Sequence, residues 1–341
     1  MIDVASAAVT PLLEEIGEAR DFRMRQLPTS GNNRVFRVDL PNRSLLLKAY
    51  FHSDADPRDR LGAEFLFTSF AWSHGLDMVP RPLAVDRANH LGLYEFVDGR
   101  RLEPEEIDWQ RVSEALRFYR ALNAHPESAA AWRLPAGSEA WFTMEGHLSC
   151  LERRLAGLQA TVPESDTDRE AAEFIATELA PAAAHVAAQV RSSAARLNQS
   201  LTREIPSEDR RLSPSDFGYH NAILRTDGRL TFVDFEYAGW DDPAKMVCDF
   251  FCAPAVPVPM RLFRAFAEAA VADLSSPEMH FQRIELLLPV YQLKWCCIML
   301  NEFQPAAKLR RRFSGALADE DNAKQAQLAK ASAALAALSN S

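Results

Sequence analysis

The sequence SPSDFGYHN at residues 213–221, followed by FVDFE at residues 232–236, decides the fold of this 341-residue chain. Residues 221–224 and 230–235 are strand-like, and each run is short enough to pair with the other. The residues between them, Thr226-Asp227-Gly228, are typical of a tight turn. The sequence therefore predicts a compact β-hairpin here.

Three polar side chains surround this hairpin in a pattern that indicates chemistry. Asp216 and Asn221 lie five residues apart on the loop before the first strand, and Asp234 lies where the second strand ends. We therefore expect the three side chains to converge. Phosphoryl transfer from a metal-bound nucleotide needs such a set, because one carboxylate accepts a hydroxyl proton while an amide oxygen and a second carboxylate hold Mg2+.

The sequence on either side of the hairpin predicts two lobes. Upstream, the runs RVFRVDL (34–40) and SLLLKAYF (44–51) indicate strands, and further strands are expected around Leu83 and over 91–97. Helical periodicity is expected over 5–20, 60–74, 104–124, 139–160, 168–199, 259–273, 280–303 and 323–338. The predicted fold class is α+β, with a small β-rich lobe at 1–98 and a mainly helical lobe at 99–341 that carries one isolated hairpin.

Composition and charge exclude several classes of protein. With 48% hydrophobic and 25% charged residues, the chain is of ordinary globular type. A net charge of −9 disfavours nucleic acid and anionic membranes as partners, and the most apolar stretch, 286–300, is too short for a membrane span. The basic run Arg310-Arg311-Arg312 is expected to form a solvated helix face. The five cysteines indicate a reducing, cytoplasmic location.

The hairpin and the segment that follows it, Gly239-Trp240-Asp241-Asp242-Pro243, resemble the corresponding sequences of the aminoglycoside phosphotransferase/choline kinase-like family. Members of that family have the bilobal fold of protein kinases. The resemblance implies a phosphotransferase that uses ATP and Mg2+. It assigns the catalytic role to Asp216 and the metal-binding roles to Asn221 and Asp234.

The small lobe extends the resemblance over about residues 27–252. SGNNRVFRV (30–38) looks like the family's turn over the nucleotide, and LYEFVDG (93–99) looks like its interlobe hinge. Lys48 looks like the strand lysine that contacts the phosphates, with Glu64 as its ion-pair partner. The residues that the resemblance implies for nucleotide binding are Gly31, Asn32, Asn33, Lys48, Glu64, Glu95 and Val97.

Two positions depart from the family pattern. The family usually has His-Gly before the catalytic Asp, whereas this chain has Pro214-Ser215. Proline can stiffen the loop but cannot form the hydrogen bonds of that histidine, so a hydroxyl of Ser213 or Ser215 is the expected replacement. The family also commonly has an Asp where this chain has Met246, with Asp249 three residues further on.

The expected acceptor is the hydroxyl group of a small molecule, such as a sugar, an amino sugar or an amino alcohol. Only a few residues separate Asp234 from the helix that follows Pro243, which leaves no room for the peptide-docking segment of protein kinases. A neutral sugar or a sugar phosphate fits the sequence equally well. The residues expected to form the far wall of the acceptor site are Tyr291, Lys294, Trp295, Asn301, Glu302 and Phe303.

Two alternatives stay open at this point. The missing His-Gly is compatible with a pseudokinase-like scaffold that binds nucleotide without turnover. The second alternative is an unrelated helical binding protein in which the Asp and Asn residues are accidental. The sequence predicts neither the identity of the acceptor nor the oligomeric state.

Overall fold

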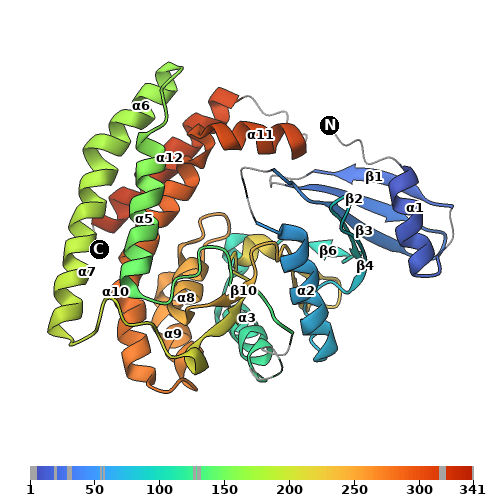
Figure 1. Cartoon of the computed structure of the whole chain (residues 1–341), viewed down its shortest axis with the longest axis horizontal. Helices are drawn as coiled ribbons and strands as arrows, with labels where there is room; N and C mark the ends of the chain where they lie inside the picture. The colour runs from blue at the N-terminus through green and yellow to red at the C-terminus, as the bar shows by residue number, and fades with distance from the viewer. Residues whose placement is uncertain are drawn as a thin grey trace.

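The N-terminal part of the chain forms a five-stranded antiparallel sheet, and the rest is mainly helical (Figure 1). The computed structural model describes residues 6–18, 21–28, 33–53, 56, 58–125, 128, 132–314 and 320–339. The predicted α+β class with a small β-rich lobe and a larger helical lobe is therefore confirmed.

The sheet of the small lobe has the strand order β1-β2-β3-β5-β4. Apolar residues on one face of β2 and β3 meet the apolar stripe of α1, so Leu12, Leu13, Val38 and Leu47 share one core. The bounds of these elements are α1 Ser6–Glu15, β1 Arg23–Leu27, β2 Arg34–Asp39, β3 Ser44–Ala49, β4 Pro82–Asp86 and β5 Leu91–Glu95.

Helix α2 (Arg60–Ser73) lies between β3 and β4 in the chain and carries Glu64 toward the sheet. Its start is determined by Asp59, whose side chain accepts a hydrogen bond of 2.8 Å from the Gly62 amide. Beyond its end Gly75 has φ of +75°, a conformation that glycine adopts without steric cost. The predicted helix over 60–74 and its stop are both confirmed.

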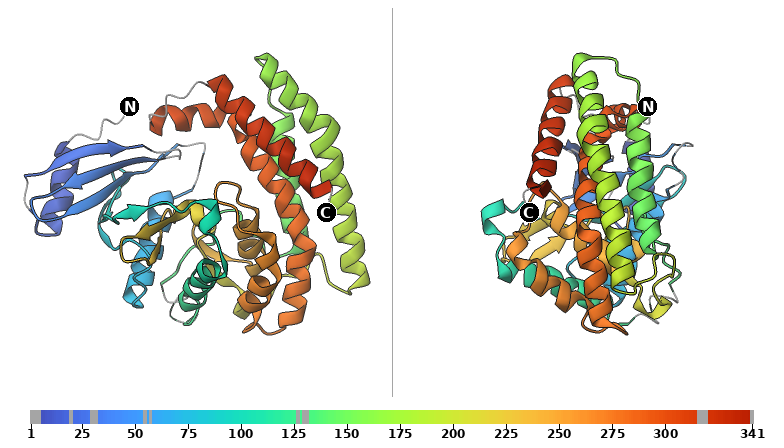
Figure 2. Two further views of the ribbon diagram at one scale, coloured as in Figure 1. Left: turned by 180° about the vertical axis from the view of Figure 1, so that it is seen from behind. Right: turned by 90° about the vertical axis from the view of Figure 1, so that its left-hand side faces the viewer.

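The larger lobe is built around the long helix α10, which packs against α5, α7, α8 and α12 (Figure 2). Among the described residues, no helix is long and apolar enough to cross a membrane. The bounds of the helices are α3 Trp109–Leu122, α5 Met144–Gln159, α6 Asp166–Phe174, α7 Ala180–Arg196, α8 Pro243–Cys252, α9 Phe263–Val271, α10 Pro277–Met299, α11 Pro305–Ser314 and α12 Glu320–Ser339.

The predicted hairpin is present, but it is not isolated. Strands β8 (Ala222–Arg225) and β9 (Leu230–Phe232) pair, and β6 (Gly99–Arg100) adds a third strand beside β8. A second small sheet joins β7 (Arg211–Ser213) to β10 (Gly239–Asp241). The expectation of a lone hairpin was wrong because strands of two or three residues are too short to produce a recognisable alternation.

Two helical segments differ from the prediction in ways that affect the site. The segment expected to be helical from residue 139 becomes helical only at Met144, because Thr143 caps the helix and Glu139 has φ of +54°. The basic run 310–312 was expected on a helix whose bounds the sequence analysis did not give; this helix is α11, which starts at Pro305. Both differences bring charged residues to the same cavity, as described below.

Candidate active site

Asp216 lies on the loop between β7 and a 3-10 turn at Tyr219–Asn221. Its carboxylate is half-buried and lies 3.1 Å from Nε2 of His220. The side-chain amide of Asn221 donates to the main-chain oxygen of Asp216 at 3.0 Å and lies 3.2 Å from its Oδ2. The structure thus brings the predicted Asp216 and Asn221 together and adds His220, which the sequence analysis did not single out.

The loop before Asp216 is held by serine hydroxyls. Ser215 has φ of +64°, which is unfavourable for a residue with a side chain. Its amide donates to Oγ of Ser213 at 3.0 Å, and its own Oγ accepts from Nζ of Lys245 at 3.3 Å. The expected hydroxyl that hydrogen-bonds the loop backbone is confirmed for Ser213, whereas the hydroxyl of Ser215 contacts the side chains of Lys245 and Asp241.

Lys48 lies on β3 and connects the two lobes. Its Nζ lies 2.6 Å from Oε2 of Glu64 on α2, and it also forms an ion pair with Asp234 of the larger lobe. Asp234 follows β9 and has φ of +68°, another left-handed conformation beside the cleft. The predicted Lys48, Glu64 and Asp234 are therefore in direct contact, although Asp234 comes from a distant part of the chain.

The charges of this cluster are unbalanced. Burial raises the pKa of Asp234 more than the attraction of Lys48 lowers it, and the nearby carboxylates of Glu236 and Asp216 make smaller contributions in the same direction as burial. Burial likewise raises the pKa of Glu64 against the attraction of Lys48. Burial opposes the charge of Lys48 too, but the surrounding carboxylates dominate and hold its pKa well above the usual value. A further cation would therefore be stabilised here.

The donor set fits Mg2+ in the presence of phosphate oxygens. Asn221 uses its NH2 group for Asp216, and its Oδ1 accepts no hydrogen bond from the described residues. Asp234 supplies a carboxylate nearby. The Val233 amide, one residue before Asp234, donates a hydrogen bond of 2.8 Å to the main-chain carbonyl of Asn221 and so keeps the two segments together. Within the described ranges no three His, Cys, Asp or Glu side chains could hold a metal alone. Two protein ligands completed by substrate phosphates are usual for Mg2+.

The other residues predicted to bind nucleotide are partly described. Asn33 is buried, donates to Glu236 at 2.5 Å and accepts from the Phe51 amide at 3.0 Å, so it joins the turn to both lobes. Glu95 ends β5, and the N–H of Val97 beyond it forms no hydrogen bond within the described part of the chain. Gly31 and Asn32 lie outside the described residues.

A cavity of about 920 Å³ opens beside Asp216. It lies between the loop of Asp216, the N-terminal segment around Arg58 and the helices α5, α8, α10 and α11. Its charged lining residues are Asp56, Arg58, Glu139, Arg154, Asp216, Lys245, Asp249, Lys294 and Arg310, and its aromatic lining residues are Trp141, Tyr237 and Trp295. An acceptor molecule that occupies this cavity would have Asp216 at one wall.

The predicted acceptor wall is half right. Lys294, Trp295 and Asn301 line the cavity because one face of the helical segment turns toward it. Tyr291 is instead buried and bonds Nδ1 of His147 at 2.7 Å, and Phe303 lies in the core. Glu302 pairs with Arg311 and does not line the cavity. The composition of a helix does not reveal which face a neighbouring loop leaves open.

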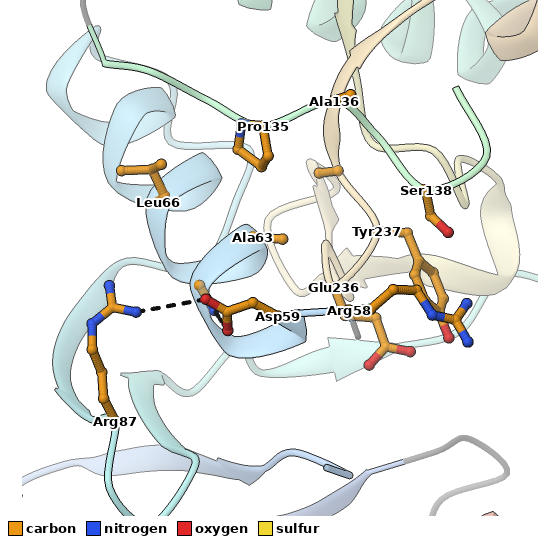
Figure 3. Close-up of a pocket in the computed structure, with 12 residues that line it drawn as sticks. Arg58, Asp59, Ala63, Leu66, Arg87, Pro135, Ala136, Ser138, Glu236 and Tyr237 are labelled. Atoms are coloured by element: carbon orange, nitrogen blue, oxygen red, sulfur yellow. Dashed lines mark hydrogen bonds and ion pairs between the residues drawn. The ribbon is translucent and has the colours of Figure 1, made fainter. Parts of the chain in front are cut away.

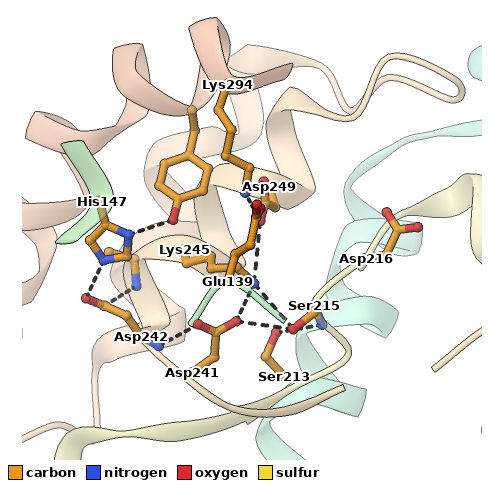
Figure 4. A network of polar contacts seen from close by, with 12 residues as sticks. Glu139, His147, Ser213, Ser215, Asp216, Asp241, Asp242, Lys245, Asp249 and Lys294 are labelled. Atoms are coloured by element: carbon orange, nitrogen blue, oxygen red, sulfur yellow. Dashed lines mark hydrogen bonds and ion pairs between the residues drawn. The ribbon is translucent and has the colours of Figure 1, made fainter. Parts of the chain in front are cut away.

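The sequence analysis missed a buried ionic network behind Asp216 (Figure 4). Lys245 forms ion pairs with Asp241 and, at 3.7 Å, with Asp249, while Lys294 lies 3.0 Å from Asp249. Asp249 also accepts from the indole of Trp295 at 2.9 Å. The carboxylate of Asp216 is turned away from this network toward the cavity (Figure 4). The i, i+4 spacing of 241, 245 and 249 was the available signal.

Solved structures show that this fold is shared with known kinases. Choline kinase from Cryptosporidium parvum Iowa II has a TM-score of 0.59 at 11% identity, covering 98% of this chain and 96% of that chain. The choline kinase LicA from Streptococcus pneumoniae gives 0.58 at 12% identity, with coverage of 97% and 98%. A spectinomycin phosphotransferase in complex with ADP and spectinomycin gives 0.57 at 8%, with coverage of 95% and 98%.

The sequence itself identifies the family. No curated protein matches it significantly. The family model described as the phosphotransferase enzyme family matches residues 23–287, which is most of the chain. The matched range includes the small-lobe site residues, the loop of Asp216, the hairpin that follows it and the helix α8. This chain therefore belongs to the phosphotransferase enzyme family and is a small-molecule kinase with the protein-kinase-like fold.

Proposed function

We propose that this chain transfers the γ-phosphate of ATP, in the presence of Mg2+, to the hydroxyl group of a small molecule. One arrangement carries the proposal: the Lys48–Asp234 ion pair joins the lobes beside Asn221, and the carboxylate of Asp216 faces an open cavity of about 920 Å³. Under this proposal a phosphate-binding cation, two metal ligands and a proton acceptor would surround one point.

The small lobe is proposed to hold the nucleotide. Lys48 would contact the α- and β-phosphates, and Glu64 keeps its ammonium in place through the 2.6 Å ion pair. The unbonded N–H of Val97 and the carbonyl of Glu95 suit the edge of adenine. Gly31, Asn32 and Asn33 would cover the phosphates. We propose residues 1–98 and 99–341 as the two lobes that enclose the nucleotide.

Asn221 and Asp234 are the proposed ligands of Mg2+. When bound, the ion neutralises charge on the phosphates and on the leaving ADP. The NH2 group of Asn221 donates its hydrogen bonds to Asp216, so its Oδ1 points away from Asp216 and is available as a metal ligand. Burial is the main cause of the raised pKa of Asp234, and the carboxylates of Glu236 and Asp216 add to it, so a cation bound beside this group would be stabilised.

Asp216 is proposed to orient the acceptor hydroxyl and to accept its proton. The acceptor oxygen forms the new bond to the γ-phosphorus, the bond from that phosphorus to the β,γ-bridging oxygen breaks, and ADP leaves. Burial opposes the ionised form of Asp216, but the hydrogen bond and charge of His220 and the hydrogen bond of Asn221 lower its pKa overall. The carboxylate is therefore ionised at neutral pH, as a proton acceptor must be.

The proposed acceptor is of sugar or amino-alcohol size. Only Tyr237 and Ala238 separate Glu236 from β10, so no extended segment is available to dock a peptide. Ligand pockets for small molecules typically have volumes of roughly 300–1,000 Å³, which includes this cavity. We propose a cytoplasmic location, because none of the five cysteines forms a disulfide.

A pair of variants tests this function against the pseudokinase alternative. Asp216→Asn should lower kcat by at least about 100-fold while Mg-ATP affinity stays within a few-fold, because shape and hydrogen bonding are kept and the basic charge is lost. Asp234→Asn should lose Mg2+-dependent ATP binding first. Thermal unfolding with ATP and Mg2+, and ATP consumption against pooled hydroxyl compounds, measure the two effects. Binding without turnover in the unaltered protein would establish the scaffold instead.

A further inference from the structure

The acceptor cavity has a charge opposite to that of the whole chain. The chain has a net charge of −9, yet among the described residues five cationic side chains line this cavity against four acidic ones. One of the four acids is Asp216, which the proposed reaction uses. Three acids therefore remain against five cations in the part of the cavity available to the rest of the acceptor.

Each of these three acids is already paired with protein cations. Asp249 accepts from Lys294 at 3.0 Å and from the indole of Trp295. Glu139 lies 2.7 Å from the guanidinium of Arg154. The third, Asp56, is shared between two arginines, as described next. A cationic acceptor would have to break one of these ion pairs, at a cost in Coulomb energy, before it found a carboxylate.

The positive charge is concentrated near Arg58. Asp56 accepts from Arg58 at 2.7 Å and from Arg60 at 2.5 Å, and Arg60 also lies 3.7 Å from Glu236, so Asp56 is the carboxylate that Arg58 shares with its neighbour. The guanidinium of Arg58 also lies 5.4 Å from the centre of the Tyr237 ring. Figure 3 shows Arg58 and Tyr237 side by side on the lining of the adjoining pocket.

Arg310 brings a third guanidinium to this corner, and it has no acidic partner among the described residues. It is half-buried, and burial lowers its pKa; Tyr237 and Asp56 oppose this effect, while the like charges of Arg58 and Arg60 add to it. A half-buried guanidinium that lies near two others and has no ion pair of its own is stabilised when an anion binds to it. The basic run was expected to be a solvated helix face, and for Arg310 that expectation was wrong.

Contacts at the far end of α11 hold Arg310 in place. The Phe313 ring packs edge-on against Phe51 at 5.5 Å, and the main-chain oxygen of Ser314 accepts from Gln26 at 3.0 Å. These contacts join α11 to the small lobe, so the helix reaches across from one lobe to the other (Figure 1). Arg310 is thus presented to the cavity by an element fixed at both lobes.

We propose that the acceptor carries an anionic group, a carboxylate or a phosphate, which Arg310 and Arg58 bind while its hydroxyl group meets Asp216. This inference rests on the function proposed above and specifies its substrate class. The rings of Trp295, Trp141 and Tyr237 line the same cavity and suit the carbon frame of a hydroxylated compound such as a sugar.

Binding of four probes of one size to the enzyme with a non-hydrolysable ATP analogue and Mg2+ tests the proposal. The probes are glucose, glucosamine, glucuronate and glucose 6-phosphate, and the measurement is isothermal calorimetry. We expect an anionic probe to bind at least about tenfold more tightly than glucose or glucosamine, with an affinity that falls as salt is added. The order of glucuronate and glucose 6-phosphate then identifies the anion.

Two variants on α11 locate the anion site. Arg310→Gln should lower the affinity for the anionic probe by about tenfold or more and leave the affinity for the ATP analogue unchanged. Arg310→Lys should restore part of the lost probe affinity. Arg311→Gln is the matched control, because Arg311 lies on the same helix, pairs with Glu302 and does not line the cavity. It should leave probe binding unchanged.

The outcomes separate this inference from the proposed function. Preferred binding of glucosamine or glucose, no difference between the probes, or an Arg310→Gln effect on ATP alone would overturn the anionic acceptor. Each of these results is compatible with Mg-ATP binding and kinase turnover. Failure of the unaltered protein to bind Mg-ATP would overturn the proposed function itself.

Discussion

At the scale of single residues, the loop before Asp216 has Ser215 at the position where the family usually has glycine. Ser215 occupies a left-handed conformation, φ of +64°, that costs a non-glycine residue about 1–2 kcal/mol. Its hydroxyl accepts from Lys245 at 3.3 Å and lies 3.4 Å from Asp241. A side chain at Gly137 would lie 2.5 Å from that hydroxyl, so Gly137 leaves the space that Ser215 occupies. The strained residue is thus held by contacts that only a hydroxyl forms.

Ser215→Ala and Ser215→Gly should differ in stability. Both variants lose the buried hydrogen bonds, at about 1 kcal/mol, but only alanine keeps the cost of the left-handed conformation. We expect Ser215→Ala to have the lower free energy of unfolding in urea, by about 1 kcal/mol relative to Ser215→Gly. Equal stability of the two variants would show that this backbone conformation carries no penalty.

His220 should control the pH dependence of turnover. It lowers the pKa of Asp216, and a lower pKa keeps the carboxylate ionised, and able to accept a proton, at lower pH. In His220→Ala the pKa of Asp216 rises, so the acid limb of the kcat/KM profile should move to higher pH. His220→Gln, which keeps a hydrogen-bond donor, should move it less. If the acid limb of the kcat/KM profile does not move in His220→Ala, His220 does not control the ionisation of Asp216 during turnover.

At the scale of elements, one carboxylate joins three helices of the larger lobe. Asp242 caps α8 by accepting from the Ala244 amide at 2.8 Å. Its other oxygen accepts from Arg283 of α10 at 2.6 Å and lies 3.1 Å from His147 of α5. The side chain of Asp242 is fully buried. Because α8 follows directly after β10 and carries Lys245 and Asp249, this carboxylate helps to position the helix that lines the cavity beside Asp216.

Asp242→Asn should destabilise the protein by about 3–5 kcal/mol, because it leaves Arg283 buried without a counter-charge. Burial opposes the ionised form, but Arg283 and His147 hold the pKa of Asp242 well below its usual range. A lowered folded-state pKa means that the contribution is complete above the unfolded pKa of about 3.9 and is lost as pH falls through the folded value.

Urea unfolding of both proteins at several pH values measures this effect. The difference in free energy of unfolding should be constant from pH 8 to pH 5 and should narrow only below about pH 4. Asp77→Asn, which removes an exposed pair with Arg229, is the control and should cost less than about 1 kcal/mol. A difference that narrows by pH 6 would refute the assigned pKa.

At the scale of the whole molecule, two of the contacts that join the lobes involve widely separated parts of the chain. Lys48 of the small lobe pairs with Asp234 of the larger one. On the other side, the Phe313–Phe51 contact joins α11 to the small lobe. The cleft beside Asp216 is therefore bordered by elements from both ends of the chain.

Lys48→Ala should lower kcat/KM for ATP by about 10- to 1,000-fold, since it removes the charge that faces the phosphates. It should also lower the free energy of unfolding, because Glu64 and Asp234 lose their counter-ion. Lys48→Arg should be nearly as inactive, because a planar fork does not replace a compact ammonium. Steady-state ATP kinetics and urea unfolding measure the two effects, and an unchanged kcat/KM would exclude the phosphate-binding role.

The sequence by itself determined the family, the two lobes and the convergence of Asp216, Asn221 and Asp234. These features depend on spacing along the chain: a hairpin brings its two ends together, and a run of leucines places Lys48 at the end of a strand. The roles assigned to these residues stay predictions until the variants are measured.

Only the tertiary structure decided the character of the acceptor cavity. Helical periodicity gives the face of a helix but not the neighbour that leaves it open, so Tyr291 was expected in the wall and lies in the core. The basic run on α11 was indistinguishable from a solvated face until α11 packed against the small lobe and turned Arg310 into the cavity. The surplus of positive charge in this cavity comes from residues more than 200 positions apart in the chain. A pattern of neighbouring residues therefore could not predict it.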